Sequence, residues 1–203
     1  MNQAPNLSRY KGIIFDLDGT LINSMGAHDT AWEQTCHAFN IPLDVPWVHQ
    51  FGGMPSRKVA VEIARRYGLE LDPVLLSQDK IARYERLATQ AEVNPQIYQI
   101  LKDQVGLKKL AIGTGGQRKH ALATLGSSDI PYLIDTLVAS DDVTEHKPNP
   151  DTFLLAAERI GLAPRDCVVF EDTLIGRQAA HAAGMDCYSV VAGEVAGFYP
   201  CDL

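Results

Sequence analysis

Short apolar runs alternate with longer amphipathic stretches along most of this chain. The runs "GIIF" and "CVVF" are apolar at every position, which is typical of strands that are covered on both faces. The longer stretches repeat apolar residues every three or four positions, the period of an amphipathic helix. We expect strands at Gly12–Phe15, Lys109–Ile112, Leu133–Ala139, Cys167–Phe170 and Cys187–Val191. The alternation of strands and helices predicts an α/β fold with a parallel sheet and helices on both of its faces.

Two of the expected helices have residues that are typical of helix ends. In "NPDTFLLAAERIGL", Asp151 is a candidate N-cap and Gly161 a candidate C-cap, with the apolar face at Phe153, Ala157 and Ile160. In "DTLIGRQAAHAAGM", a helix is expected to start near Asp172 and to stop at Gly184.

The stretch from about Gly26 to Gln90 breaks the alternation, because it contains helical patterns and no good strand. The expected apolar faces are Trp32, Cys36 and Phe39; Val59, Ile63 and Tyr67; and Val74, Ile81, Tyr84 and Ala88. This pattern predicts a small all-helical domain inserted after the first strand. Such an insertion would lie over the carboxyl edge of the sheet, where open α/β sheets bind ligands.

Polar and glycine-containing segments follow four of the expected strands. They are "DLDGT" at 16–20, Thr114-Gly115-Gly116, the loop "SDDVTEHKPNP" with Lys147, and Glu171-Asp172. The carboxyl ends of neighbouring parallel strands meet at one edge of a sheet. We therefore expect four acids, a lysine, a hydroxyl and several backbone amides in one crevice.

This set of groups suits phosphoryl transfer. Asp16 can attack phosphorus as a nucleophile and form an aspartyl-phosphate. Asp18 can protonate the leaving oxygen and then activate water. The two roles need opposite protonation states, and repulsion between nearby carboxylates separates their pKa values.

The remaining groups suit a metal ion and a phosphate. Glu171 and Asp172, with Asp16 and a backbone carbonyl, offer the hard oxygen ligands that Mg²⁺ prefers. Lys147, the Thr114 hydroxyl and nearby amides can stabilise the phosphoryl oxygens. Glycine at 115 and 116 allows the backbone to approach a phosphate closely.

The same motifs partly match other known sequence patterns. "DLDG" is not an EF-hand loop, because its glycine falls at position four instead of six and the twelfth position is Ala27. "GTGGQR" has Arg118 where a dinucleotide-binding motif needs glycine, and no P-loop Gly-Lys-Ser/Thr follows. Each acid could also be a helix cap or a solvated loop charge, and for Asp172 alone this alternative stays open.

The segments "FDLDGTLINS", "LAIGTGG", "EHKPNPDTF" and "VVFEDTLIGRQAAHAAGM" resemble the four ordered motifs of the haloacid dehalogenase-like hydrolase superfamily. The helical insertion is similar to the cap of its β-phosphoglucomutase/phosphatase subfamily. Within this subfamily, the chain looks closest to fructose-1-phosphate phosphatase-like members. The resemblance implies a Rossmann-like catalytic core at 1–24 and 91–203, and a helical cap domain at 25–90.

The resemblance also implies roles for individual residues. Asp16 would be the nucleophile and Asp18 the acid/base, with Thr114, Gly115 and Lys147 at the phosphate. The implied Mg²⁺ ligands are Asp16, the Asp18 carbonyl, Glu171 and Asp172. In the cap, His28, Arg57 and Lys80 fall where related enzymes contact the substrate; the alternatives are an ordinary helix histidine and solvated charges.

Two positions depart from the family pattern. Asn23 replaces an aspartate that many members carry after the first motif. Gly52 stands where mutases often have a lysine on the cap loop. The missing cation weakens the case for an enzyme that handles bisphosphates, but Lys80 and Arg57 could still serve.

The leading hypothesis is a Mg²⁺-dependent phosphatase that acts on small sugar phosphates such as fructose 1-phosphate. The alternative is a β-phosphoglucomutase-type isomerase, and the motifs do not separate the two. The complete set of acids and lysine disfavours a non-catalytic binding role.

Composition adds expectations about partners and location. The formal net charge of −7 argues against nucleic acid as a partner. No segment approaches the ~18 apolar residues of a membrane span. The absence of a signal-peptide pattern and the four dispersed cysteines favour a cytoplasmic protein with reduced thiols. We expect a monomer, without excluding an oligomer.

Overall fold

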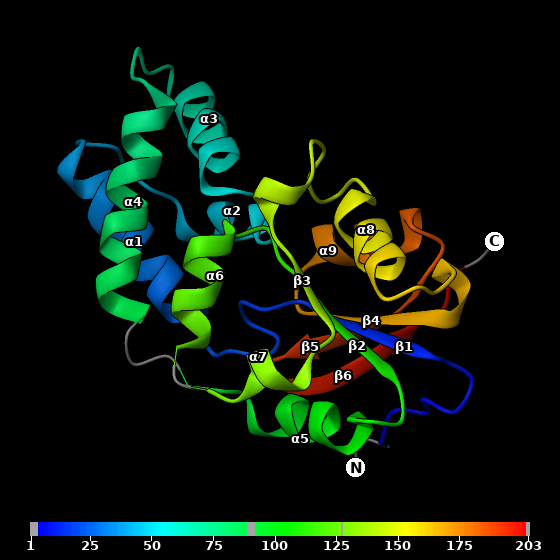
Figure 1. Cartoon of the computed structure of the whole chain (residues 1–203). Coiled ribbons are helices and arrows are strands. Elements are labelled where there is room, and N and C mark those ends of the chain that lie inside the picture. The colour runs from blue at the N-terminus through cyan, green and yellow to red at the C-terminus, as the bar shows by residue number, and fades with distance from the viewer. Residues whose placement is uncertain (1–3, 89–91, 127, 202–203) are drawn as a thin grey trace.

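A computed structural model of the chain describes residues 4–88, 92–126 and 128–201. These residues contain a six-stranded sheet with the order β3-β2-β1-β4-β5-β6 (Figure 1). The strands are β1 Gly12–Phe15, β2 Lys109–Gly113, β3 Thr136–Val138, β4 Cys167–Glu171, β5 Asp186–Val191 and β6 Glu194–Tyr199. Strands β1 to β5 pair in parallel, and β6 pairs antiparallel to β5 at the edge. The predicted α/β fold with a parallel sheet is therefore confirmed.

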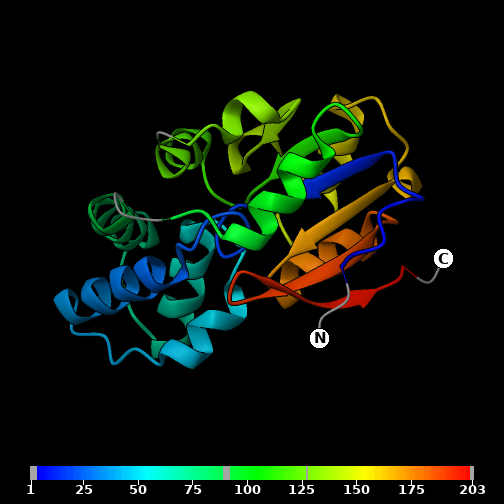
Figure 2. The same ribbon diagram turned by 90° about the horizontal axis from the view of Figure 1, so that it is seen from below.

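Helices cover both faces of this sheet. The helices of the core are α5 Pro95–Gln104, α6 Arg118–Leu125, α7 Ile130–Leu133, α8 Asp151–Arg159 and α9 Leu174–Ala182, with 3₁₀ turns η3 Ser140–Asp142 and η4 Pro164–Asp166. Side chains alternate across β1: Ile13 and Phe15 pack in the layer with α5, α6 and α7, whereas Ile14 packs in the layer with α8 and α9. Figure 2 shows α5 lying across one face. Both faces of β1 are thus covered by helices, which explains why this strand is apolar at every position.

The segment between β1 and α5 is helical and has an apolar core of its own. It contains α1 Met25–Ala38, α2 Val45–Val48, η1 His49–Phe51, α3 Ser56–Tyr67 and α4 Pro73–Leu87 (Figure 1). Its buried residues include Trp32, Cys36, Val59, Ile63 and Leu76. The predicted domain boundaries stay a prediction, and residues 89–91 lie outside the described residues.

The two chain segments that connect this helical insertion to the sheet lie side by side. The amide of Asn23 donates to the carbonyl of Glu92 at 2.8 Å, and the amide of Asn94 donates to the carbonyl of Leu21 at 2.8 Å. The buried Asn94 side chain also donates to the carbonyl of Thr20 at 2.7 Å. These bonds satisfy backbone groups that would otherwise be orphaned, and they tie the exit and the return of the insertion together.

Several element boundaries differ from the sequence prediction. Strand β3 is shorter than Leu133–Ala139, because Pro131 at the first turn of α7 starts a helix that includes Leu133. Strand β6 was not predicted. Helix α8 begins at Asp151 itself, with Pro150 as N-cap and no side-chain capping bond. Gly161 follows this helix at a φ of +73°, a conformation that glycine tolerates best.

Within the insertion, the inward face of α4 differs most from the sequence prediction. Its buried residues are Leu76, Ser77, Lys80 and Tyr84, so a lysine lies inside the face. Val74 and Ile81, which were predicted to lie with Tyr84, are half-buried and line a cavity instead. Helix α4 therefore turns polar groups toward the interior, which the apolar period did not indicate.

Two further predictions concern membranes and thiols. None of the helices that the structure describes is long and apolar enough to span a bilayer. Cys36, Cys167 and Cys187 are buried as free thiols, and Cys201 is half-buried. Cys167 and Cys187 pack in the layer with α8 and α9, where they act as small apolar side chains.

Candidate active site at the carboxyl edge of the sheet

The central strands fix the polar residues at one edge of the sheet. Phe15, the last residue of β1, aligns with Ile112 of β2 and Phe170 of β4. Asp16 follows, and its amide donates to the carbonyl of Phe170 at 2.9 Å. The amide of Thr114 donates in the same way to the carbonyl of Val138 at 2.9 Å. Parallel register thus brings the predicted motifs together.

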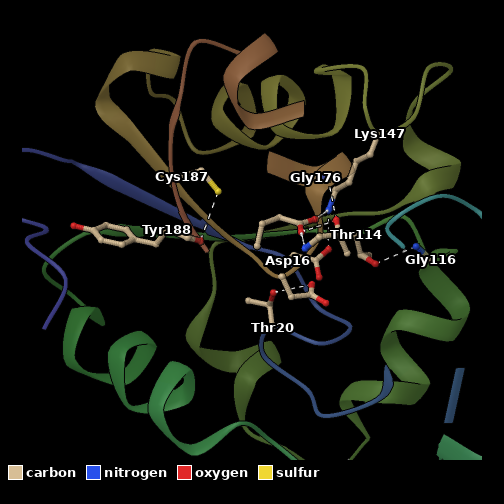
Figure 3. A network of polar contacts seen from close by, with 11 residues as sticks. Asp16, Thr20, Thr114, Gly116, Lys147, Gly176, Cys187 and Tyr188 are labelled. Carbon is tan, nitrogen blue, oxygen red and sulfur yellow. Dashed lines mark hydrogen bonds and ion pairs between the residues drawn. The ribbon is translucent and has the colours of Figure 1, made fainter. Parts of the chain in front are cut away.

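A buried ion cluster lies at this edge. The Lys147 Nζ donates to Asp16 Oδ1 and to Glu171 Oε1, each at 2.7 Å (Figure 3). The second carboxylate oxygen of Glu171 accepts from the amide and the hydroxyl of Thr173, at 2.6 and 2.8 Å. Lys147 also lies 4.7 Å from the centre of the Phe153 ring. The structure therefore places Lys147 between two of the predicted acids.

Burial and charge shift the pKa values in this cluster. Burial and the nearby Glu171 raise the pKa of Asp16 to about 7, against the opposing effect of Lys147. Burial, Glu171 and Asp16 raise the pKa of Asp172 well above its ordinary value. Burial alone would lower the pKa of Lys147, but Asp16 and Glu171 outweigh it and raise this pKa. The cluster has more acid than one lysine can balance.

The same acids fit a hard divalent cation. Asp16, Glu171 and Asp172 each offer a carboxylate oxygen, and these oxygens lie within 4.8 Å of one another. A cation there would favour the ionised forms of Asp16 and Asp172 and so oppose the rise in their pKa values. Asp18 does not add its carboxylate to this group. Its predicted contribution, the backbone carbonyl, stays a prediction.

Two glycines make room for these acids. A Cβ at Gly176 would lie 1.7 Å from Glu171 Oε1, so any side chain there would displace this carboxylate. Gly19 has a φ of +90°, and a Cβ on it would lie 2.2 Å from Asp172 Oδ2. The Thr20 hydroxyl donates to Asp172 Oδ1 at 3.3 Å, as Figure 3 shows for the labelled Thr20. Asp172 is not a helix cap, because Thr173 caps α9.

Asp18 faces the helical insertion. Its Oδ1 accepts from the Ser24 hydroxyl at 2.6 Å and from the Tyr84 hydroxyl at 2.9 Å. His28 Nε2 lies 3.4 Å from the same oxygen. Burial would raise the pKa of Asp18, but His28 and the two hydroxyls outweigh it and lower this pKa. The pKa values of the two aspartates thus differ in the direction opposite to the one that the predicted roles require, because burial and Glu171 outweigh Lys147 at Asp16, whereas His28 and the two hydroxyl donors outweigh burial at Asp18.

The predicted cap residues His28 and Lys80 contact each other. Lys80 Nζ donates to His28 Nδ1 at 2.6 Å, which leaves the proton of a neutral ring on Nε2, toward Asp18. Burial and Lys80 lower the pKa of His28. The His28 ring stacks on Tyr84 at 4.0 Å between centroids. Both residues therefore belong to a packed polar group behind Asp18.

A cavity of about 850 Å³ opens between the insertion and the sheet edge. The predicted residues that line it are Asp16, Asp18, His28, Arg57, Lys80, Thr114 and Gly115. Lys147, Glu171 and Asp172 do not line it, but Lys147 contacts Asp16, and the carboxylates of Glu171 and Asp172 lie within 4.8 Å of that of Asp16. The Thr114 hydroxyl accepts from the amide of Gly116 at 3.0 Å, which shapes this loop (Figure 3). Arg57 is exposed and has no ion pair or hydrogen bond among the described residues.

The loop at Gly52-Gly53 of the insertion touches the core beside this cavity. A Cβ at Gly115 would lie 2.0 Å from the carbonyl oxygen of Gly53, so the two backbones are in close contact. A Cβ at Gly52 would lie 2.9 Å from the Thr173 side chain. This crowding gives a physical reason for glycine at 52, where the mutase pattern often has lysine.

Sequence reasoning missed three residues of the site. Ser24 and Thr173 were not singled out, although both follow the acidic motifs within a few positions. Tyr84 was assigned only to an apolar face. A usable signal existed for Tyr84, because it lies four residues after Lys80 and so on the same helix face.

Comparison with known proteins gives the class of this fold and site. The family model described as "Hydrolase: haloacid dehalogenase-like hydrolase" matches residues 10–184. The chain belongs to this family, and its relatives support the β-phosphoglucomutase-type subfamily. It is a phosphoric monoester hydrolase.

Three similar proteins represent the relatives. Fructose-1-phosphate phosphatase YqaB of Escherichia coli (strain K12) is 36% identical over 182 residues, which are 90% of this chain and 97% of that protein. Beta-phosphoglucomutase of Bacillus subtilis (strain 168) is 28% identical over 200 residues, 91% of this chain and 84% of the relative. The solved structure of a hydrolase from Pseudomonas syringae has a TM-score of 0.81 at 31% identity, with 90% of this chain and 85% of that chain covered.

Proposed function

We propose that this enzyme is a Mg²⁺-dependent phosphatase of small sugar monophosphates, with fructose 1-phosphate as the first candidate, and that it works through an aspartyl-phosphate. The observation that carries the proposal is the buried acid–lysine cluster beneath a cavity that both Asp16 and Asp18 line. The similarity to a fructose-1-phosphate phosphatase supports the choice of substrate.

The reaction has two steps. In the first, Asp16 Oδ attacks phosphorus, the bond from phosphorus to the sugar oxygen breaks, and Asp18 in its acid form gives that oxygen a proton. In the second, a water oxygen attacks the phosphorus of the aspartyl-phosphate while the Asp18 carboxylate takes the proton from water. The bond from phosphorus to Asp16 breaks, which restores the Asp16 carboxylate and releases inorganic phosphate.

The other residues would bind the phosphoryl group of the substrate and the metal ion. Lys147, the Thr114 hydroxyl and the amides of the 114–116 loop would bind phosphoryl oxygens. Asp16, Glu171 and Asp172, with the Asp18 carbonyl, would hold Mg²⁺. When it is bound, the cation neutralises carboxylate and phosphate charge, so that an anionic nucleophile can approach an anionic substrate.

The charges around the cavity favour a monophosphate substrate and transfer of its phosphoryl group to water. Two exposed cations at its wall each have a glutamate nearby, which lowers the positive charge of the cavity: Lys58 lies 3.9 Å from Glu145, and Lys119 lies 3.9 Å from Glu85. Lys80 is bound to His28. Among the described Lys and Arg side chains at the cavity, this leaves Arg57 for a second anionic group. An isomerase must hold a second phosphate, so the phosphatase is the better fit.

A phosphate-release screen against a panel of sugar phosphates with Mg²⁺ tests this proposal. We expect turnover of hexose monophosphates and loss of activity when EDTA removes the metal. A parallel assay follows the interconversion of β-glucose 1-phosphate and glucose 6-phosphate. Efficient interconversion with little phosphate release would overturn the proposal in favour of the isomerase.

A further inference from the structure

The Asp18 carboxylate is held from one side, by groups that belong to the insertion or to the segment leading into it. Ser24, immediately before α1, and Tyr84, on α4, both donate to Oδ1. No hydrogen bond reaches Oδ2 from the described residues. A Cβ built on Gly116 would lie 3.9 Å from Oδ2, so this oxygen faces the loop that holds the Thr114 hydroxyl. The insertion therefore determines which oxygen of Asp18 is left for the reaction.

Tyr84 makes a second contact, which leads back to the core. Its hydroxyl oxygen lies 3.1 Å from the Thr124 hydroxyl on α6. Because the Tyr84 proton is used on Asp18, the Thr124 hydroxyl must donate to Tyr84. Asp18 and Thr124 both belong to the sheet-bearing core, whereas Tyr84 belongs to the insertion. The chain of hydrogen bonds from Thr124 through Tyr84 to Asp18 is complete only when α4 lies against α6.

We propose that Tyr84 is a positioning residue, which orients the Asp18 carboxylate for proton transfer when the insertion is seated on the core. This inference rests on the proposed function. When α4 moves away, Tyr84 loses Thr124 and Asp18 loses Tyr84 together, so the acid/base group is set in the seated arrangement. When the insertion lies away from the core, Asp18 is therefore not aligned to accept a proton from a water molecule in the site.

The test compares wild type with Tyr84→Phe, which removes the hydroxyl but keeps the ring that stacks on His28. The substrate is p-nitrophenyl phosphate, whose nitrophenolate leaves without needing a proton. The first step then tolerates a misplaced Asp18, whereas hydrolysis of the aspartyl-phosphate does not. We expect kcat to fall by about 10- to 100-fold and KM to fall with it, so that kcat/KM, which reports the first step, changes much less. A burst of about one nitrophenol per enzyme should precede the slow steady state.

Two further sets of variants serve as controls. Thr124→Val should lower kcat by a few-fold, and Thr124→Ser, which keeps the hydroxyl, should restore it. Tyr188→Phe removes a different buried tyrosine hydroxyl, one that donates to the carbonyl of Asn6 away from the cavity, and should leave kcat unchanged.

Two results would overturn the role of Tyr84. One is a Tyr84→Phe enzyme with wild-type kcat. The other is a loss of activity without a burst, accompanied by a fall in melting temperature, which would indicate a structural role only. Failure of the proposed function looks different: Asp16→Asn would then still release phosphate, and no phosphorylated enzyme would form in any variant.

Discussion

Two lysines in this molecule are each only 1% exposed, yet they lie in opposite electrostatic surroundings. Lys147, at the edge of the sheet, lies between the carboxylates of Asp16 and Glu171, and these raise its pKa. Lys80, in the insertion, is bound to the neutral ring of His28 and lies 4.7 Å from the centre of the Tyr84 ring. Burial lowers the pKa of Lys80 to about 8, and the more distant Asp18 and Asp29 only partly oppose it.

Lys147 therefore stabilises the ion cluster of the site, whereas the burial of Lys80 lowers the stability of the folded protein. Removing one partner of a buried ion pair leaves a charge without compensation, which is strongly destabilising. Burying a lysine beside neutral groups lowers stability instead, and natural proteins retain such a destabilising residue where their function needs it. The comparison predicts that equivalent substitutions at 147 and 80 change stability in opposite directions.

The largest effect is expected from Asp16→Asn, which removes the nucleophile and one carboxylate partner of Lys147. Turnover should fall by at least about 10³-fold, because an amide does not form the aspartyl-phosphate. Phosphate release with Mg²⁺ measures this loss, and circular dichroism checks that the fold is intact. Retained Mg²⁺-dependent release would remove Asp16 from the nucleophile role.

Lys147→Met should lower the free energy of unfolding by about 3–5 kcal/mol, because it leaves Asp16 and Glu171 buried without their shared cation. Urea unfolding measures this change. EDTA is present because it removes any metal ion that could replace the charge of the lysine. Added Mg²⁺ should recover part of the loss. Unchanged stability would mean that Lys147 does not hold the cluster together.

Lys80→Met should raise the free energy of unfolding at pH 7 by roughly 1–3 kcal/mol, while it lowers activity on sugar phosphates. Between pH 8 and about 10.4, the unfolded wild type keeps a proton that the folded protein has lost. Wild-type stability therefore rises with pH in this window, and the advantage of the variant should shrink. A variant less stable than wild type at pH 7 would contradict the comparison.

The smallest effect is expected from Arg57→Ala, which removes an exposed cation at the cavity. KM should rise by about 10-fold for sugar phosphates and much less for a small aryl phosphate, which does not reach this side chain. Stability should change little, since Arg57 has no ion pair among the described residues. Equal effects on both substrates would exclude Arg57 from substrate selection.

The parts of the fold that local pattern determines were predictable from the sequence. The runs "GIIF" and "CVVF" gave central strands with boundaries correct to one residue. Strand β6, "EVAGFY", is an edge strand with mixed exposure and a glycine, so it lacks a clear apolar signal. The acids at strand ends were predictable because parallel register brings these ends together. The spacing of Tyr84 from Lys80 could have assigned it to the site, but its bond to Thr124 depends on α6 lying against α4, which no local pattern indicates.

The most direct test of the central claim is detection of a phosphoryl group on Asp16. The enzyme is mixed with fructose 1-phosphate and Mg²⁺, quenched in acid within milliseconds, digested, and analysed by mass spectrometry. We expect the phosphoryl group on the peptide that contains Asp16, and a higher proportion of it in Tyr84→Phe, where its hydrolysis is slowed. Phosphate release from an active enzyme with no phosphorylated Asp16 at any quench time would contradict the account.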